Sequence, residues 1–85
     1  MRYSLRKDAN QAIIVEALRK GGCTVEVLHE PADLLVGRHG NNYILEVKDR
    51  GGKLNEKQRH WHAQWNGSAH VVRTAEEALK VVGLL

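Results

Sequence analysis

The chain has 85 residues, which suits one domain and lies near the lower end for a self-sufficient hydrophobic core. Its composition, 42% hydrophobic and 27% charged, is that of a globular protein, and no apolar run approaches a membrane span or a signal peptide. A single cysteine, Cys23, excludes an internal disulfide and a CxxC zinc site, so we expect a small buried residue in a reducing cytoplasm. The net charge of +3 permits a nucleic-acid partner without establishing one.

The first predicted helix follows a short basic lead, residues 1–6, and runs from residue 7 or 8 to Lys20. Asp8 is a plausible N-cap, because its short side chain can accept a hydrogen bond from the first turn. Lys20 lies near the negative end of the helix, and Gly21-Gly22 ends it.

One carboxylate of this helix has two possible positions. Glu16 lies beside Ala9, Ala12 and Ile13, on a face of mostly small side chains, so it can point inward toward the rest of the fold. Alternatively, it forms an exposed pair with Lys20 four residues later. The sequence favours neither position.

A hairpin stands at the centre of the sequence. The predicted strands before and within it cover residues 23–29, 34–36 and 43–48. Residues 38–42, between the last two strands, tolerate the positive φ of a tight turn. Because side chains alternate along a strand, Glu46 and Lys48 share one face of the last strand. Two opposite charges on one face of an apolar strand indicate a role other than packing.

The pairing of this hairpin decides where Asp33 lies. A turn centred on Gly40-Asn41 places Asp33 opposite Lys48 and diagonal to Glu46, and a turn shifted by one residue places Leu35 opposite Lys48. In both registers Asp33 shares the face of Glu46 and Lys48. Diagonal neighbours lie about 7–8 Å apart at Cα, a spacing that lets two carboxylates reach one metal ion.

A second helix is predicted over 55–66, after a flexible basic loop. Asn55 and Gln58 have the spacing of a capping box. The residues that share one face of this helix are Leu54, Gln58, Trp61 and Trp65. Gln58 therefore either only caps the helix or bonds a nearby backbone group, or it takes part in a site. We expect the two tryptophans to cover the sheet rather than to stack on bases.

The predicted elements end with a strand over 69–73 and a helix that Thr74 caps. The order is then αβββαβα, and the third and fourth strands are joined through the second helix, which predicts a right-handed parallel crossover. We expect one α/β domain over residues 1–85, with a four-stranded mixed sheet flanked by helices.

Asp33, followed by Glu46-Val47-Lys48, resembles the D…ExK core of the PD-(D/E)XK nucleases, and Gln58 resembles the glutamine that follows that core in several of their branches. The sequence is most similar to the small stand-alone VRR-NUC nucleases of phages and bacteria, over nearly its whole length. The archaeal Holliday junction resolvases are more distant relatives. The resemblance implies a restriction endonuclease-like fold.

Two positions depart from the family pattern. The family usually has proline directly before the aspartate, whereas here Ala32 separates Pro31 from Asp33, and the preceding segment is short. The family often carries a glutamate in the first helix near the position of Ile13, which is apolar here. Either Glu16 substitutes for it, or the site is incomplete.

The resemblance implies a Mg²⁺- or Mn²⁺-dependent endonuclease that hydrolyses DNA phosphodiester bonds. Asp33 and Glu46 would hold the metal, with the Val47 carbonyl as a further ligand, and hard oxygen donors of this kind suit Mg²⁺. Lys48 would orient or deprotonate the attacking water, and Gln58 would position the water or Lys48. Structured DNA such as a Holliday junction would be the substrate, and cutting two strands symmetrically would need a homodimer.

Four basic residues of the loop and second helix are candidates for contacts to the DNA backbone: Arg50, Lys53, Lys57 and Arg59. For each of them a solvated surface position is equally compatible with the sequence. Two other functions stay open: a catalytically degenerate nuclease-fold module that binds DNA or a partner protein, and a nuclease that serves restriction or RNA processing.

Overall fold

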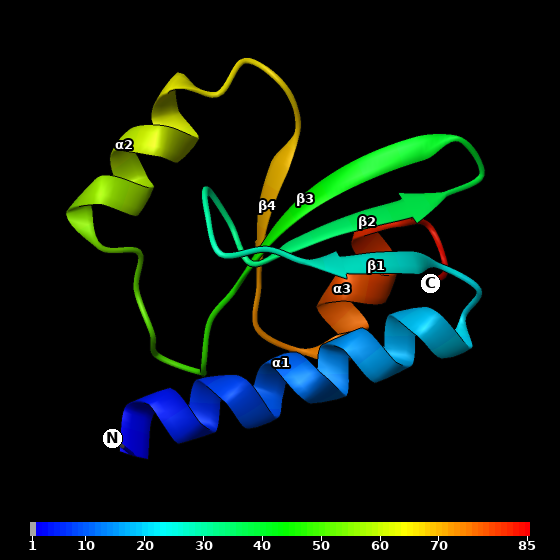
Figure 1. Ribbon diagram of the computed structural model, residues 1–85, viewed down its shortest axis with the longest axis horizontal. Coiled ribbons are helices and arrows are strands. Elements are labelled where there is room, and N and C mark those ends of the chain that lie inside the picture. Colours follow the sequence, from blue (N-terminus) through cyan, green and yellow to red (C-terminus); the bar gives the residue numbers. More distant parts are fainter. Residues whose placement is uncertain (1) are drawn as a thin grey trace.

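The computed structural model describes the backbone of residues 2–85 and the side chains from residue 9 onward (Figure 1). The elements follow the predicted order. They are α1 (Arg2–Lys20), β1 (Thr24–Val27), β2 (Leu34–Arg38), β3 (Asn41–Val47), α2 (Glu56–Gln64), β4 (Ala69–Val72) and α3 (Ala75–Val81). No helix of the described part is long and apolar enough to cross a membrane.

The four strands form one mixed sheet in the order β1-β2-β3-β4. β1 and β3 both run antiparallel to β2, whereas β3 and β4 are parallel. A parallel pair needs a crossover connection, which α2 and its flanking loops provide, as predicted. The chain therefore has the α/β fold that the resemblance implied, with the end of β3 at the middle of the sheet.

The hydrophobic core lies between one face of the sheet and the helices α1 and α3 (Figure 1). Alternate residues of the strands supply the sheet side of this core, because successive side chains point to opposite faces. The completely buried members from the helices and the central hairpin are Ile14, Leu18, Ala78, Leu34, Val36, Leu45 and Val47. Cys23 is buried as expected, and burial raises the pKa of its thiol, although the charge of Arg38 opposes this shift.

The hairpin turn consists of His39 and Gly40, so both predicted registers are wrong. Their φ values are 51° and 81°, and positive φ at both central residues is what a type I′ turn requires. The prediction included Asn41 in the turn because asparagine tolerates positive φ. In the structure Asn41 is instead the first residue of β3 and pairs with Arg38. The observed pairing is shifted from each predicted pairing by an even number of residues. An even shift leaves every side chain on the same face of the sheet, so Asp33 still shares the face of Glu46 and Lys48.

Helix α1 begins at Arg2, not at residue 7 or 8. The basic lead is thus part of the helix, and Asp8 lies inside it rather than at its N-cap. Residues 2–7 contain no glycine or proline, and arginine, leucine and lysine are good helix formers. Nothing in this segment prevents the helix from extending toward the N-terminus.

Helix α2 begins with the predicted capping box and ends at Gln64, with Trp65 as its C-cap. It contains no buried residue and lies away from α1 and α3 (Figure 1). The expectation that the tryptophans cover the sheet is wrong: Trp61 is half-buried and Trp65 is 44% exposed. Their rings stack on each other instead, with centroids 5.1 Å apart.

Candidate active site

The end of β3 and the residue before β2 bring the first predicted site residues together. The backbone N–H of Asp33 donates to the Leu45 carbonyl over 3.2 Å, and the N–H of Val47 donates to Oδ2 of Asp33 over 2.8 Å. The Asp33 carboxylate is thereby fixed alongside the last residues of β3. Glu46 lies between Leu45 and Val47, on the predicted face.

Glu46 and Lys48 form a buried ion pair. Their side chains are 2% and 6% exposed, and the Lys48 ammonium lies 3.6 Å from Oε2 of Glu46. They are the buried charged residues of the described part of the chain. Removing two charges from water costs free energy that their attraction often fails to recover, so such a pair is weak support for stability. Its presence at the centre of a small domain indicates a functional demand.

Gln58 caps α2, which is one of the alternatives that the sequence left open, and its side chain also contacts Glu46. Its backbone N–H donates to Oδ1 of Asn55 over 2.8 Å, and its Oε1 accepts from the Asn55 backbone N–H over 2.9 Å. The amide nitrogen of the same side chain donates to Oε2 of Glu46 over 3.1 Å. The cap therefore orients the Gln58 amide toward the carboxylate, and this contact ties α2 to β3.

A cavity of about 260 Å³ opens beside Asp33 and Glu46. Residues of the β1–β2 loop and of α2 also line it: His29, Glu30, Pro31, Ala32, Asn55, Lys57, Gln58 and Trp61. At the exposed rim, Nζ of Lys57 lies 2.8 Å from Oε1 of Glu30. This hydrogen bond and the opposite charges lower the pKa of Glu30 and raise the pKa of Lys57. The cavity is large enough for a small group, and three carboxylates line it: Glu30, Asp33 and Glu46.

His62 is a neighbour of the site that the sequence did not single out. It lies one helical turn after Gln58, and its Nε2 is buried with no hydrogen-bond partner within the described residues. Burial lowers the pKa of His62, and the charge of Lys48 lowers it further. The i,i+4 spacing from Gln58 is the sequence signal that could have indicated this imidazole as a neighbour of the site.

Asn10 of α1 is a second residue that the sequence did not single out. Its side-chain amide donates to the carbonyls of Lys48, over 3.1 Å, and Arg73, over 3.0 Å. These carbonyls directly follow β3 and β4, so one side chain joins the ends of two parallel strands. Asn10 therefore fixes the backbone that carries Lys48. An asparagine inside a helix, where its propensity is poor, was the available signal.

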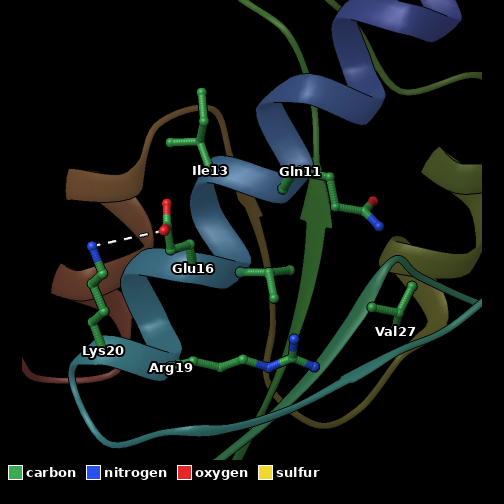
Figure 2. Close-up of a pocket in the computed structure, with 8 residues that line it drawn as sticks. Gln11, Ile13, Glu16, Arg19, Lys20 and Val27 are labelled. Atoms are coloured by element: carbon green, nitrogen blue, oxygen red, sulfur yellow. Dashed lines mark ion pairs between the residues drawn. The ribbon is translucent and has the colours of Figure 1, made fainter.

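Glu16 does not join the other predicted residues. Its side chain is 68% exposed and pairs with Lys20 over 3.7 Å, which is the alternative arrangement considered from the sequence (Figure 2). It lines a different hollow, between α1 and the exposed Val27 of β1 (Figure 2). Ile14 is completely buried, so its side chain marks the side of α1 that faces the core. Glu16 follows two residues later, about 200° further around the helix axis, and therefore points away from the core.

The four predicted DNA-contacting residues are all exposed, but they lie in different surroundings. Lys57 lies at the rim of the cavity beside Asp33 and Glu46, whereas Arg50 lines a separate hollow with Arg73. Arg59 donates to the Leu54 carbonyl over 3.4 Å. Of the four, only Lys57 borders the cavity of the two carboxylates in the part of the chain that the structure describes.

The oxygen donors at this site suit a hard divalent cation. The carboxylates of Asp33 and Glu46 line one cavity, and Val47 directly follows Glu46 at the end of β3. No cluster of three or more histidine, cysteine, aspartate or glutamate side chains with metal-binding geometry occurs among the described residues. Magnesium is compatible with so few protein ligands, because it retains several waters and contacts substrate phosphate.

No protein-family model matches the sequence, and no curated protein is similar to it at a significant level. A solved structure described as a VRR_NUC domain matches the fold with a TM-score of 0.72 and a sequence identity of 24%. The match covers 89% of this chain and 92% of the other, so the likeness extends over the whole domain rather than over a common substructure. This protein therefore has a VRR-NUC-like α/β fold.

Proposed function

We propose that this protein is a metal-dependent nuclease that hydrolyses phosphodiester bonds in DNA. The observation that carries the proposal is the buried Glu46–Lys48 pair, which Gln58 contacts and which lies beside a cavity shared with Asp33. A carboxylate pair with an adjacent ammonium matches the demands of phosphodiester hydrolysis: neutralisation of charge at phosphorus and an activated water. The VRR-NUC-like fold supports the same chemistry.

Each residue has a role that follows from its position. Asp33 and Glu46, with the Val47 carbonyl, would hold Mg²⁺ or Mn²⁺, which supplies charge neutralisation and a more acidic water when bound. Lys48 directs its ammonium toward Oε2 of Glu46, a carboxylate that lines the cavity, and from there it would orient the attacking water and stabilise the phosphate charge. Gln58 is a positioning residue, because its amide fixes the Glu46 carboxylate.

The substrate in this proposal is branched or otherwise structured DNA, cut by a homodimer. One chain of this size carries one such site, and symmetric cleavage of two strands requires two sites related by a twofold axis. The exposed Arg50, Lys53, Lys57 and Arg59 contact phosphates, which position the protein without reading sequence. Lys57 must then exchange its partner Glu30 for a phosphate.

Cleavage of labelled DNA tests the proposal. Wild type, Glu46→Ala and the matched control Glu16→Gln are incubated with Mg²⁺ or Mn²⁺ and a four-way junction, a flap, a linear duplex or RNA. We expect metal-dependent cleavage by wild type and by Glu16→Gln, because Glu16 lies on another surface, and none by Glu46→Ala. Cleavage of RNA in preference to DNA would assign the domain to RNA processing, and the rank of the DNA forms would establish or refute selectivity for branches.

A second candidate is a nuclease-fold module that binds DNA or a partner protein without cutting. One observation favours it: from residue 9 onward, α1 contributes no carboxylate to the cavity, and Glu16 points elsewhere. If this module is the function, folded wild type cuts no substrate with either metal. Wild type and Glu46→Ala then bind DNA equally well.

A further inference from the structure

The half-buried Trp61 of α2 and the exposed Trp65 at its C-cap form a stacked pair. Their ring centroids lie 5.1 Å apart with an interplanar angle of 18°, and Trp65 is 44% exposed. Tryptophan is highly buried on average in folded proteins, and α2 itself has no buried residue. The pair therefore leaves a large aromatic surface open to a partner.

This surface continues directly from the candidate active site. Trp61 lines the same cavity as Asp33 and Glu46. Gln58, Trp61 and Trp65 follow one another at helical spacings of three and four residues, so they lie along one face.

The position of Trp65 depends on a glycine. A Cβ atom added to Gly67 would lie 2.8 Å from Nε1 of Trp65 and 3.2 Å from its Cε2. The indole therefore lies directly against the Gly67 backbone, and any larger residue there would displace it. The substitution Gly67→Ala should therefore displace the Trp65 indole while leaving the tryptophan in the chain.

The charge around the pair favours nucleic acid over a protein partner. Trp61 lines the cavity of the proposed phosphodiester site, and Lys57, one helical turn before Trp61, lies at the rim of that cavity. Lys57 is paired there with Glu30, a partner that it can exchange for a phosphate. Exposed aromatic rings beside basic side chains are the combination that binds single-stranded nucleic acid, because every base has a π face and every linkage a negative charge.

We infer that Trp61 and Trp65 are a stacking platform for unpaired bases next to the phosphate that is cut. The protein would then select DNA with single-stranded nucleotides at the cleavage point, such as a branch, a flap or a frayed end. The choice of cleaved bond rests on the proposed nuclease function. The stacking itself is independent of catalysis and can be measured without metal.

Tryptophan fluorescence gives a selective readout, because the sequence contains two tryptophans and both belong to the platform. Wild type in EDTA is titrated with a single-stranded oligothymidylate and with a blunt duplex of the same length. We expect quenching by the single strand and little change with the duplex. Absence of quenching by a single strand that binds, as measured by anisotropy of a labelled oligonucleotide, would overturn the inference.

Variants separate stacking from other effects. Trp65→Ala should weaken single-strand affinity about tenfold, since stacking on one aromatic ring has roughly that effect, and Gly67→Ala should weaken it less. Val27→Ala changes an exposed apolar residue of β1 on a different surface and should bind as wild type. Circular dichroism confirms that each variant is folded. Equal affinity of Trp65→Ala and wild type, with a shift from dimer to monomer in sedimentation, would make the pair a self-association surface and refute the platform.

The same variants distinguish failure of this inference from failure of the proposed function. Quenching by single strands without cleavage of any substrate refutes the nuclease and leaves the platform intact. Cleavage by Trp65→Ala with wild-type rate and wild-type preference among flap, junction and duplex refutes the platform and leaves the nuclease intact.

Discussion

The two faces of the sheet differ in what covers them. The face toward α1 and α3 is closed by apolar side chains, including Ile14, Leu18 and Leu45, which are completely buried. The face toward α2 carries the buried Glu46–Lys48 pair, and α2 contributes no buried residue. Burial of apolar surface on the first face supplies most of the folding free energy, while the second face keeps charges and an open aromatic pair. The apolar packing and the candidate functional residues therefore lie on opposite faces of the sheet.

The largest expected effect on stability comes from breaking the ion pair on the polar face. Lys48→Met removes the ammonium beside a carboxylate that is 2% exposed, so we expect a loss of about 3–5 kcal/mol in the free energy of unfolding. Urea denaturation measures it. An unchanged midpoint would mean that the pair is solvated or neutral, and the contrast between the two faces would be wrong.

A cavity in the apolar face should have a comparable or smaller effect. Leu45→Ala removes a completely buried side chain, which typically costs about 2–5 kcal/mol. Leu35→Ala, on the neighbouring strand, changes a residue that is 37% exposed on the other face and is the matched control. Equal destabilisation by both variants in urea would show that the two faces share the apolar packing.

Asn10 connects the two regions, so its removal should have an intermediate effect. Asn10→Ala leaves the carbonyls of Lys48 and Arg73 without their side-chain donor, and we expect a loss of about 1–3 kcal/mol. Because the Lys48 backbone also loses its support, cleavage should fall by more than the unfolded fraction explains. If the cleavage rate falls only in proportion to the folded fraction of Asn10→Ala, Asn10 has a structural role alone.

The smallest expected effect is a dependence of stability on pH from His62. Burial and the Lys48 charge lower the pKa of this imidazole below its ordinary value of about 6.5. The unfolded chain therefore binds the proton first, and stability falls as the pH drops below about 6.5, until the folded-state pKa is reached. The slope should be smaller in His62→Gln than in wild type when thermal unfolding is followed from pH 8 to pH 5. Identical slopes would contradict it.

Local rules predicted the parts of the site that depend on periodicity and spacing. Alternation along a strand predicted that Asp33, Glu46 and Lys48 share one face. The turn was predicted too late in the chain, but the resulting shift in pairing is an even number of residues and leaves each side chain on the same face. The spacing of Asn55 and Gln58 likewise predicted the capping box that orients the amide.

The remaining features depend on contacts between distant residues. The two carbonyls that Asn10 binds lie 38 and 63 residues away in sequence, so no local pattern reveals them. The exposure of Trp65 follows from the placement of α2 beside the sheet rather than on it. Helical geometry allowed Glu16 two positions, one facing the core and one exposed beside Lys20. Only the structure shows that Ile14 faces the core, and this orientation of α1 leaves Glu16 exposed.

The most direct test of the central claim combines stability and cleavage in one double variant, Glu46→Leu with Lys48→Met. Replacing a buried ion pair by apolar residues of similar size is often neutral or stabilising. We predict an unfolding free energy equal to or above that of wild type, together with complete loss of the Mg²⁺- or Mn²⁺-dependent cleavage that wild type shows. Cleavage by the double variant at the wild-type rate, or no cleavage of any DNA form by wild type, would contradict the claim that this pair serves phosphodiester hydrolysis.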